Sequence, residues 1–234
     1  MAPKSRKQVS PSGSIYVVST PIGNLEDITL RALRILKEVS LIAAESRSRT
    51  RKLCTHYGIK TPVTTYNAHN QHYKGRELIE KANSGLDIAL VSDAGTPGLS
   101  DPGSRLIREA IQAGILLVPV PGVSAPLTAL SISGLPTDRF VFVGFLSNKQ
   151  GRRRRELEGL RQEPRTMIFF ESPHRLIKML SDVFEILGDR EIALAKEMTK
   201  VYEDVGRGRI SRILSLLKDT EIRGEYTIIV QGSR

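Results

Sequence analysis

The sequence has no tryptophan and a single cysteine, Cys54, among its 234 residues. One thiol excludes an intramolecular disulfide framework and a cysteine-based zinc site, and it is typical of a protein from a reducing cytosol. We interpret Cys54 as a small apolar residue on a helix face. His69 and His72 lie three residues apart without a third ligand nearby. We therefore interpret them as solvated and expect no bound metal.

The sequence also lacks a run that would span a membrane. Its longest apolar stretch, Ile115–Leu135, contains three prolines and two glycines, which would break a spanning helix. The basic first residues have no apolar core behind them, unlike a secretion signal. We expect residues 1–13 to form a flexible tail and the protein to be cytoplasmic.

Several common catalytic motifs are missing. There is no G-x-x-x-x-G-K-[ST] run, no G-x-G-x-x-G after the first predicted strand, no H-E-x-x-H and no G-x-S-x-G. These absences argue against a P-loop hydrolase, a dinucleotide-binding Rossmann domain, a zinc protease and a serine hydrolase with a nucleophile elbow.

Positive charge is in excess. The chain has 35 Lys plus Arg against 25 Asp plus Glu, a net charge of +10, within an ordinary globular composition. Such an excess favours a polyanionic partner, and arginine offers phosphate a planar, permanently charged fork. A run of four arginines cannot occupy one helix face, so part of it would be a solvated surface. For a nucleic-acid partner, the predicted phosphate-binding residues are Arg47, Arg49, Arg152, Arg153, Arg154 and Arg155. Aromatic residues are few, which favours capture of a nucleic-acid backbone over stacking on bases.

Apolar runs of strand length alternate with helix-period segments in the first half of the chain. This order, with almost continuously apolar strands, predicts a mainly parallel sheet covered on both faces. The first helix is expected from about Asp27, acting as its N-cap, to Val39. Further helices are expected at Arg47–Tyr57, up to about Asn83, and at Ser104–Ala113. The predicted strands are Ile15–Ser19, Leu41–Ala44, Val63–Tyr66, Asp87–Ser92 and Ile115–Val120.

In the second half, strands follow one another with fewer helices between them, which is typical of a mixed or antiparallel sheet. Helices are expected at Leu176–Leu187 and near Ile210–Leu217. The predicted strands are Arg139–Phe145, Arg165–Phe170, Glu191–Lys196, Lys200–Gly206 and Tyr226–Val230. The sequence thus predicts two α/β domains, at residues 14–122 and 137–234, joined by a helix-containing connector at residues 123–136.

Three turns rich in glycine and proline follow predicted strands of the first half: Thr20–Leu25, Ser92–Gly103 and Pro121–Ala125. Ligands of open α/β sheets bind at the carboxyl ends of the strands. Glycine lets the backbone approach a ligand and proline restricts the turn. Any α/β protein has such turns singly, but three of them favour a shared ligand cleft.

In their order and spacing, these turns and four further segments resemble the tetrapyrrole methylase superfamily of S-adenosylmethionine-dependent methyltransferases. Within it, the sequence is similar to the bacterial small-subunit ribosomal RNA (cytidine-2′-O-)methyltransferases, from about Ile15 to Gly232. The segments that carry the resemblance are Ser19–Thr29, Val91–Pro97, Asp101–Gly103, Pro121–Gly122, Gly134–Phe140, Phe170–Arg175 and Lys196–Lys200. One segment departs from the family, which usually reads A-E-D-T-R where this chain has Ala44-Glu45-Ser46-Arg47-Ser48.

The resemblance implies two α/β domains with the methyl donor, S-adenosylmethionine, in a cleft between them, in a homodimer that acts on small-subunit ribosomal RNA or the assembled subunit. It also implies that main-chain groups of the strand-end loops hold the donor. By position, the implied cofactor-binding residues are Pro21, Asp93, Ala94, Gly95, Pro121, Ser124, Ala125, Phe170 and Ala195, with Gly224–Tyr226 as a further segment.

Methyl transfer to a ribose hydroxyl needs an aligned attacking oxygen and an acceptor for one proton. Alignment supplies about 7–11 kcal/mol, and a general base typically 10²–10⁴-fold. Candidate bases are Glu171, His174 and Glu197, and we favour Glu171 or His174. The alternative is that Glu171, Arg175 and Glu197 form structural ion pairs. Two other functions stay open from the sequence: methylation of a corrinoid or porphyrin precursor, and non-catalytic RNA binding in ribosome assembly.

Overall fold

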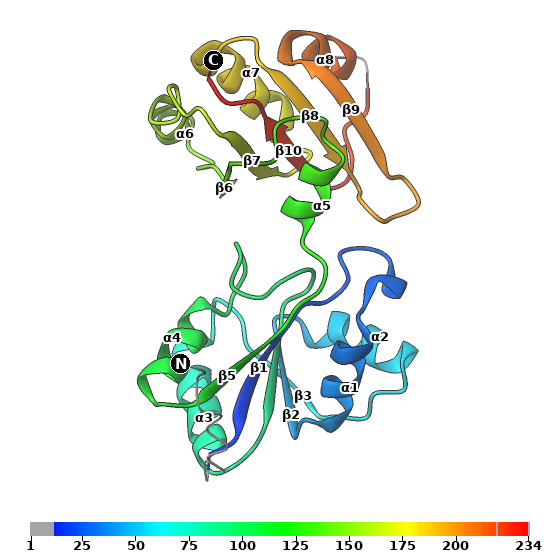
Figure 1. Ribbon diagram of the computed structural model, residues 1–234, viewed down its shortest axis with the longest axis vertical. Helices are drawn as coiled ribbons and strands as arrows, with labels where there is room; N and C mark the ends of the chain where they lie inside the picture. The colour runs from blue at the N-terminus through cyan, green and yellow to red at the C-terminus, as the bar shows by residue number, and fades with distance from the viewer. Residues whose placement is uncertain (1–11, 219, 234) are drawn as a thin grey trace, which may run out of the picture. The chain divides into compact units, whose positions relative to one another are not determined.

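The computed structural model describes residues 12–218 and 220–233, which form two compact units (Figure 1). The first unit contains the described residues up to Pro21 and Leu25–Val123. The second contains Ile22–Asn24 and the described residues from Ser124 onward. The turn at Thr20–Leu25 therefore supplies residues to both units. The predicted tail at residues 1–13 lies almost wholly outside the described residues.

A five-stranded sheet with the order β3-β2-β4-β1-β5 forms the centre of the first unit. All neighbouring strands are parallel, as the sequence predicts. The strands are β1 (Ser14–Val18), β2 (Leu41–Ala44), β3 (Val63–Thr65), β4 (Ile88–Val91) and β5 (Leu116–Val120). Because they run in one direction, their carboxyl ends and the loops that follow them share one edge of the sheet.

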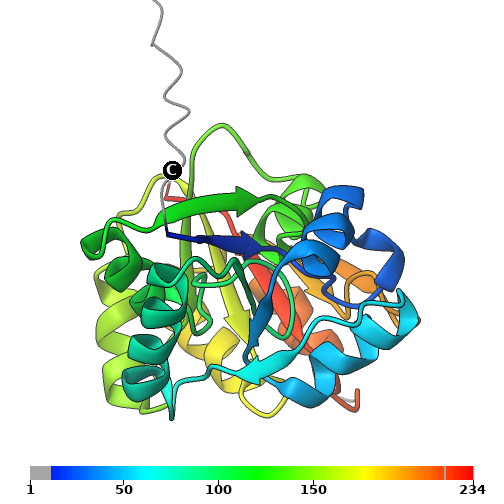
Figure 2. The same ribbon diagram turned by 90° about the horizontal axis from the view of Figure 1, so that it is seen from below.

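Helices cover both faces of this sheet (Figures 1 and 2). Helices α1 (Leu30–Glu38) and α2 (Arg47–His56) lie on one face, and α3 (Gln71–Asn83) and α4 (Ser104–Gln112) on the other. Successive residues of β2 serve opposite faces: Ile42 packs in the α1–α2 core, and Ala43 in the α3–α4 core. Two buried faces explain why these strands are apolar almost throughout.

The first helix begins later than the sequence predicts. Asp27 is not its N-cap, because Leu25–Asp27 form a short 3-10 turn before the helix. The N-cap is Thr29, whose side chain accepts a hydrogen bond from the amide of Ala32 at 3.1 Å. The interpretation of Cys54 is confirmed: it is buried on α2, and burial raises the pKa of its thiol.

The second unit has a mixed five-stranded sheet with the order β6-β7-β10-β8-β9, as predicted. Strand β6 is parallel to β7, and the other neighbouring pairs are antiparallel. The strands are β6 (Phe140–Phe145), β7 (Thr166–Glu171), β8 (Glu191–Lys196), β9 (Asp204–Arg209) and β10 (Tyr226–Val230). The prediction of a strand from Lys200 is wrong at its start. The left-handed backbone of Glu197 and Thr199 turns the chain, and pairing resumes only at Asp204.

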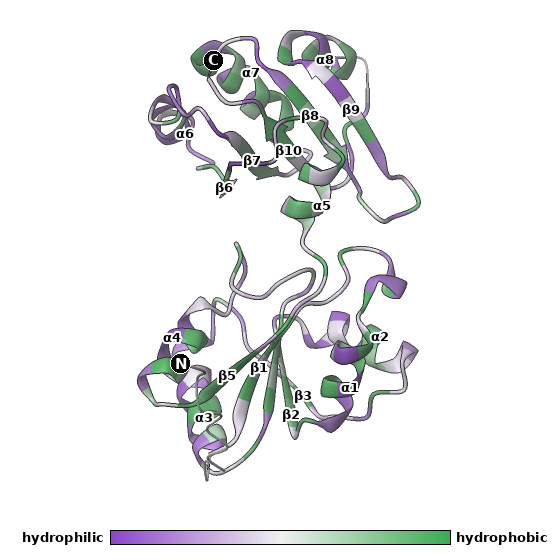
Figure 3. Ribbon diagram, viewed as in Figure 1, coloured by the Kyte–Doolittle hydropathy of each residue, from purple (hydrophilic) through white to green (hydrophobic). Residues whose placement is uncertain are grey.

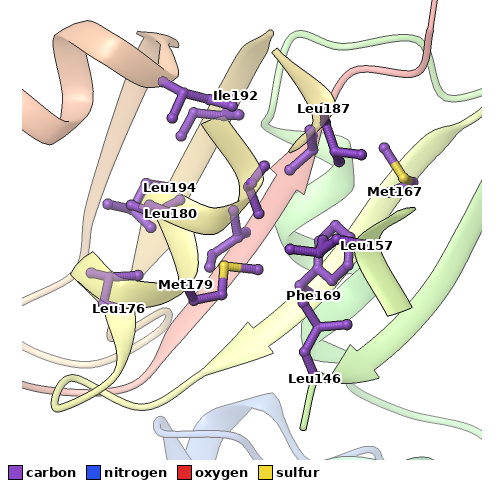
Figure 4. Packing of buried hydrophobic residues seen from close by; sticks show 14 of the residues in the cluster. Leu146, Leu157, Met167, Phe169, Leu176, Met179, Leu180, Leu187, Ile192 and Leu194 are labelled. Carbon is purple, nitrogen blue, oxygen red and sulfur yellow. The ribbon is translucent and has the colours of Figure 1, made fainter. Parts of the chain in front are cut away.

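Helices α6 (Gln150–Glu158), α7 (Leu176–Leu187) and α8 (Ile210–Leu217) cover one face of the second sheet. Leu157 of α6 and Leu180 of α7 are buried in their common core with Phe169 of β7 (Figure 4). Full burial of each leucine contributes about 1.5–3 kcal/mol. On the other face, α5 (Ala125–Ser131) packs Ala129 and Leu130 against the sheet. The segment predicted as a connector thus contains a helix docked on the second sheet.

Within residues 12–218 and 220–233, we find no helix with both the length and the hydropathy needed to cross a bilayer. The longest helix is α3, with 13 residues, whereas a span needs about 20.

Candidate active site

The strand-end loops of the first sheet are bonded to one another. Thr20 and Gly95 exchange two main-chain hydrogen bonds, of 2.9 and 3.0 Å. The amide of Ser19 donates to the carbonyl of Val120 at 3.1 Å. The loops that follow β1, β4 and β5 are therefore a single hydrogen-bonded structure. It contains the predicted cofactor-binding residues of the first unit, which are Pro21, Asp93, Ala94, Gly95 and Pro121.

Hydroxyl groups of buried residues join these loops by further hydrogen bonds. The Thr20 hydroxyl donates to the Ser92 carbonyl at 3.2 Å, and the hydroxyls of Ser19 and Thr96 lie 2.8 Å apart. Thr96 also donates to the carbonyl of Val123 at 3.4 Å. Each of these bonds joins two different loops, so the main chain at this edge is held in place without a bound partner.

Glycine is required at two positions of this edge. Gly95 has a φ of 75°, a left-handed conformation that side chains rarely adopt. A Cβ added to Gly122 would lie 2.9 Å from the Cβ of Ser19, closer than carbon atoms pack. The absence of a side chain at Gly122 therefore allows the loops after β1 and β5 to touch.

Three carboxylates lie at the same edge: Glu45, Asp93 and Asp101. Asp93 accepts from the amide of Ser46 at 3.0 Å, and the Asp93 amide donates to Glu45 at 3.2 Å. Burial, followed by the nearby charges of Glu45 and Asp93, raises the pKa of Asp101 to about 6. Asp101 therefore exchanges its proton close to neutral pH. The sequence analysis names Glu45 in the segment that departs from the family and Asp101 in a segment that carries the resemblance, but it assigns neither residue a role.

Ser46, which stands where the family usually has aspartate, still caps the N-terminus of a helix. Ser46 is the N-cap of α2, and its hydroxyl accepts from the amide of Arg49 at 3.4 Å. Serine and aspartate are comparably good N-caps, so this substitution leaves the start of α2 in place. The guanidinium of Arg49 lies 3.3 Å from the Asp93 carboxylate. Arg47 is exposed, and no ion pair of its side chain is found in the described part of the chain.

In the second unit, the predicted residues Phe170 and Ala195 come together. Both pair with Thr227 of β10, from β7 on one side and β8 on the other. All three lie on the sheet face that carries α5, because Ala195 packs in the α5 core. Ser124 and Ala125 occupy the N-terminus of α5. The structure thus gathers the predicted cofactor-binding residues of this unit on one sheet face and its covering helix.

Glu171 and His174 lie in one turn after β7 but in opposite environments. The Glu171 side chain is 0% exposed, and its Oε1 accepts from the amide of Ser172 at 2.8 Å. Its Oε2 lies 3.1 Å from the Arg175 guanidinium, without hydrogen-bond geometry. Arg175 donates instead to the carbonyl of Leu146 at 2.7 Å. His174 is exposed at the surface of the turn.

Glu197 is engaged in a polar network. Its Oε1 accepts from Lys200 Nζ at 2.8 Å and from the amide of Glu225 at 2.9 Å. The hydrogen bond from Lys200 lowers the pKa of Glu197, so this carboxylate holds a proton poorly. A Cβ on Gly224 would lie 2.5 Å from Glu197 Cγ, which shows how closely the two segments approach. The network fixes the Gly224–Tyr226 segment beside the end of β8.

The four arginines of α6 divide into two pairs. Arg153 is 4% exposed, and its Nε donates to Asp182 of α7 at 2.7 Å. Arg154 donates to Asp182 at 2.8 Å and to Glu185. Arg152 and Arg155 are exposed, on a helix that is hydrophilic over most of its length (Figure 3). Half of the run is therefore engaged in ion pairs with α7, and the other half faces solvent.

Two searches of residues 12–218 and 220–233 bear on other kinds of site. No group of three or more His, Cys, Asp and Glu side chains there is arranged to hold a metal ion. An open hollow of about 660 Å³ lies beside the start of β6 and contains none of the predicted site residues. Its lining residues are Asp138, Arg139, Phe140, Glu163, Pro164 and Arg165.

The Tetrapyrrole (Corrin/Porphyrin) Methylases family matches residues 14–214, which covers most of the first unit and much of the second. The chain belongs to the tetrapyrrole methylase family. As a member of this family, the protein is a methyltransferase, and the loops that the resemblance implicates lie within the matched range.

The relatives of this tetrapyrrole methylase include two bacterial proteins named Ribosomal RNA small subunit methyltransferase I. The one from Bacillus subtilis (strain 168) is 48% identical over 224 residues, which is 96% of this chain and 77% of that protein. The one from Escherichia coli O157:H7 is 46% identical over 225 residues, 95% of this chain and 79% of that protein.

Two solved structures share the fold of this tetrapyrrole methylase at low identity. Uroporphyrin-III C-methyl transferase from Thermus thermophilus, complexed with S-adenyl homocysteine, has a TM-score of 0.66 at 21% identity and covers 94% of this chain and 97% of that one. A diphthine synthase has a TM-score of 0.70 at 15% identity, covering 94% of this chain and 90% of that one.

Proposed function

We propose that this tetrapyrrole methylase transfers a methyl group from S-adenosylmethionine to the 2′-hydroxyl of a cytidine in small-subunit ribosomal RNA. The observation that carries the proposal is the similarity, over almost the whole chain, to proteins named Ribosomal RNA small subunit methyltransferase I. The basic surface of the chain, with a net charge of +10, supports a nucleic-acid substrate.

The strand-end loops of the first unit suit a cosubstrate held by main-chain groups. Gly122 leaves no side chain above Ser19, and Gly95 brings its backbone to the same edge. When bound, S-adenosylmethionine supplies an activated methyl group on a positively charged sulfur. The carboxylates of Glu45 and Asp93 at this edge favour a positive charge nearby. Phe170, Ala195, Ser124 and Ala125 stay in the proposed binding set on the strength of the resemblance.

We propose that His174 is the general base that accepts the proton of the ribose hydroxyl. It is exposed, and histidine is the side chain that most often serves as a general base in enzymes. Glu171 is sealed from solvent, so its proposed role is to hold the turn through Arg175 rather than to touch the substrate. Glu197 is proposed to support the Gly224–Tyr226 segment. Alignment supplies about 7–11 kcal/mol and exceeds the contribution of any base.

Phosphate contacts are proposed for Arg47, Arg49, Arg152 and Arg155, which are exposed. Arg153 and Arg154 are left out of this set, because their guanidinium groups are paired with the buried carboxylate of Asp182. Arg49 stays in it, because the side chain that pairs with Asp93 is 68% exposed. Moving Arg153 toward RNA would leave a buried carboxylate without its partner, which is costly.

The experiment is methyl transfer from S-adenosylmethionine with a radioactive methyl group. Assembled small subunits, naked small-subunit RNA and a porphyrin precursor are offered separately, and the labelled nucleotide is mapped. The proposal expects label on a cytidine ribose. Label on the porphyrin precursor alone would contradict it in favour of tetrapyrrole methylation. No binding of S-adenosylmethionine in calorimetry, together with no transfer to any of the three, would favour a non-catalytic RNA-binding assembly protein.

We also propose that the protein acts as a homodimer in the bacterial cytoplasm, where its proposed substrate is found. The resemblance supports the dimer, as do the apolar side chains of Val201 and Tyr202, which are exposed in the turn between β8 and β9. Sedimentation equilibrium tests the dimer. A monomer at micromolar concentration would contradict it.

A further inference from the structure

Phe145, at the carboxyl end of β6, has a large exposed ring with a rigid support. The residue is 57% exposed. On its other side, the ring lies 5.4 Å from the ring of Phe170, which in turn lies 5.2 Å from that of Phe142. Three aromatic rings are therefore in contact, and the outermost one faces solvent. A ring held in this way loses little conformational freedom when a flat partner stacks on it.

A β-bulge produces this arrangement. Phe142 pairs with Ile168 and Phe145 with Phe170, so β6 has one residue more than β7 over this stretch. Without the extra residue, Phe142 and Phe145 would point to opposite faces of the sheet, since side chains alternate. The bulge lies between Phe142 and Gly144, whose φ of 76° is left-handed, and it places both rings on the face of Phe170. Bulges commonly re-aim a side chain at functional sites.

The residues that follow Phe145 form two hydrogen bonds with other segments. The carbonyl of Leu146 accepts from Arg175 at 2.7 Å, and the amide of Ser147 donates to Glu156 of α6 at 2.9 Å. The buried pair of Arg153 and Asp182 holds α6 on α7. Phe145 and the exposed side of α6 are thus connected by a short segment with defined contacts.

The exposed side of α6 carries positive charge that the described residues leave unneutralised. Lys149, Arg152 and Arg155 are exposed and form no ion pair within residues 12–218 and 220–233. Arg155 donates only to the carbonyl of Gly151, at 3.1 Å, which leaves its charge available. The Phe145 ring lies on the sheet face that carries α5, and α6 packs on the other face, but Phe145 ends the edge strand β6 and Lys149 follows it by only four residues. A nucleic-acid strand that passes this edge of the sheet can therefore meet both the ring and the cations, and proteins combine exposed rings with cations to bind single-stranded nucleic acid.

We propose that Phe145 stacks on a base of single-stranded RNA, while Lys149, Arg152 and Arg155 bind its phosphates. We call these four residues the β6–α6 surface. The inference rests on the proposed RNA substrate. It adds that one residue stacks on a base and that the bound RNA is single-stranded. A duplex hides the faces of its bases within the stack, so the β6–α6 surface favours unpaired nucleotides.

The first test measures fluorescence anisotropy of a short unstructured RNA and of a duplex of the same sequence. Stacking is worth about 1–3 kcal/mol per base, so Phe145→Leu is expected to weaken single-strand binding about 5- to 150-fold. Duplex binding is expected to change less than about twofold, because the paired bases of a duplex cannot stack on Phe145. Phe145→Trp keeps a ring and is expected to bind the single strand as the unchanged protein does.

The matched control is Phe140→Leu, the same substitution at the other end of β6, where the ring is also partly exposed. It is expected to leave single-strand binding unchanged. Circular dichroism checks that each variant is folded. Equal single-strand affinities for the unchanged protein and Phe145→Leu would overturn the stacking role, as would equal losses for Phe145→Leu and Phe140→Leu.

The second test separates phosphate contacts from stacking by salt dependence. Each phosphate contact contributes about 0.7 to the log–log slope of single-strand affinity against salt. The double variant Arg152→Gln/Arg155→Gln is expected to lower the slope by about 1.4, whereas Phe145→Leu leaves it unchanged. The control is Arg31→Gln/Lys37→Gln on α1, which removes equal charge from another exposed surface. An equal change of slope in the control pair would overturn the assignment of phosphates to α6.

These outcomes differ from a failure of the proposed function. If the unchanged protein methylates small subunits and Phe145→Leu has the same KM and kcat, the function stands and the stacking inference is wrong. If the unchanged protein binds RNA through Phe145 but transfers no methyl group, the β6–α6 surface stands and the proposed reaction is wrong. A protein that binds no RNA overturns both.

Discussion

The two units present different chemistry at their predicted site residues. In the first unit, glycine turns and main-chain hydrogen bonds form the edge of the sheet, with Gly95, Gly122 and the hydroxyls of Ser19 and Thr20 at its centre. In the second unit, charged side chains dominate, as in the pairs Glu171–Arg175, Glu197–Lys200 and Arg153–Asp182. A main-chain site tolerates a change of side chain, such as Ser46, as long as backbone geometry is kept. A side-chain site depends on single atoms.

The largest effect is expected from removing the proposed general base of the second unit. His174→Ala is expected to lower kcat for RNA methylation about 10²- to 10⁴-fold, the usual contribution of a general base. Binding of S-adenosylmethionine, measured by calorimetry, is expected to stay unchanged, since His174 is not among the proposed cofactor-binding residues. His72→Ala, at the start of α3, is the control and is expected to keep full activity.

A kcat for His174→Ala within about twofold of the unchanged protein would contradict the assignment. Glu171→Gln then becomes informative, because a loss of kcat in that variant alone would identify the buried Glu171 carboxylate as the proton acceptor.

A second prediction concerns the buried ion pair that holds α6. Asp182→Ala leaves the guanidinium of Arg153 buried without its carboxylate, so the free energy of unfolding is expected to fall by about 3–5 kcal/mol. The double variant Arg153→Met/Asp182→Leu is expected to recover most of this loss, because no unpaired charge stays buried. Denaturant unfolding measures both.

The exposed pair Arg34–Glu38 on α1 provides the contrast in the first unit. Arg34→Met is expected to cost less than about 1 kcal/mol, the range for exposed ion pairs. Similar losses for Asp182→Ala and Arg34→Met would show that the α6–α7 pair is not a structural requirement.

The third prediction tests the main-chain character of the first unit. Gly122→Ala places a Cβ 2.9 Å from the Cβ of Ser19 and is expected to push apart the loops after β1 and β5. Overpacking of this kind lowers the free energy of unfolding by about 1–3 kcal/mol. The displaced loops are also expected to bind S-adenosylmethionine more weakly, as measured by calorimetry. Ser19→Gly in the same chain removes the opposing Cβ and is expected to restore binding. Full affinity in Gly122→Ala alone would argue against a cosubstrate held at this edge.

The smallest expected effect is a pH dependence at Asp101. Its pKa, raised to about 6 by burial and by Glu45 and Asp93, means that the folded protein binds this proton more tightly than the unfolded chain does. Its stabilising contribution is present below about pH 4 and is lost as the pH rises through about 6. Asp101→Asn is thus expected to raise the free energy of unfolding at pH 7.5 by about 1 kcal/mol, after allowing for partial solvent exposure.

At pH 4 the gain from Asp101→Asn is expected to vanish, because Asp101 is then protonated in the folded protein. Unfolding curves at the two pH values measure the difference, and Asp138→Asn, at an exposed position, is the control. An equal gain at both pH values would show that the carboxylate cluster does not raise the proton affinity of Asp101.

The sequence by itself determined the architecture. Unbroken apolar strands required a sheet buried on two faces, and the structure confirms that arrangement around β1, β2 and β4. The same patterns set Leu176–Leu187 as a helix and Tyr226–Val230 as a strand, with the bounds that the structure has. Periodicity and turn residues act locally, so these features can be read without knowing the neighbours.

Only the tertiary structure decided which side chains are free to act. Arg152 and Arg153 are adjacent in a uniform run, yet one is exposed and the other is bound to Asp182, 29 residues along the chain. The proton affinity of Asp101 depends on its burial, and then on the charges of Glu45, from the end of another strand, and of Asp93. The orientation of Phe145 depends on one bulged residue in the pairing of β6 with β7. Burial, charge proximity and strand register are set by contacts between distant segments, and no local pattern contains them.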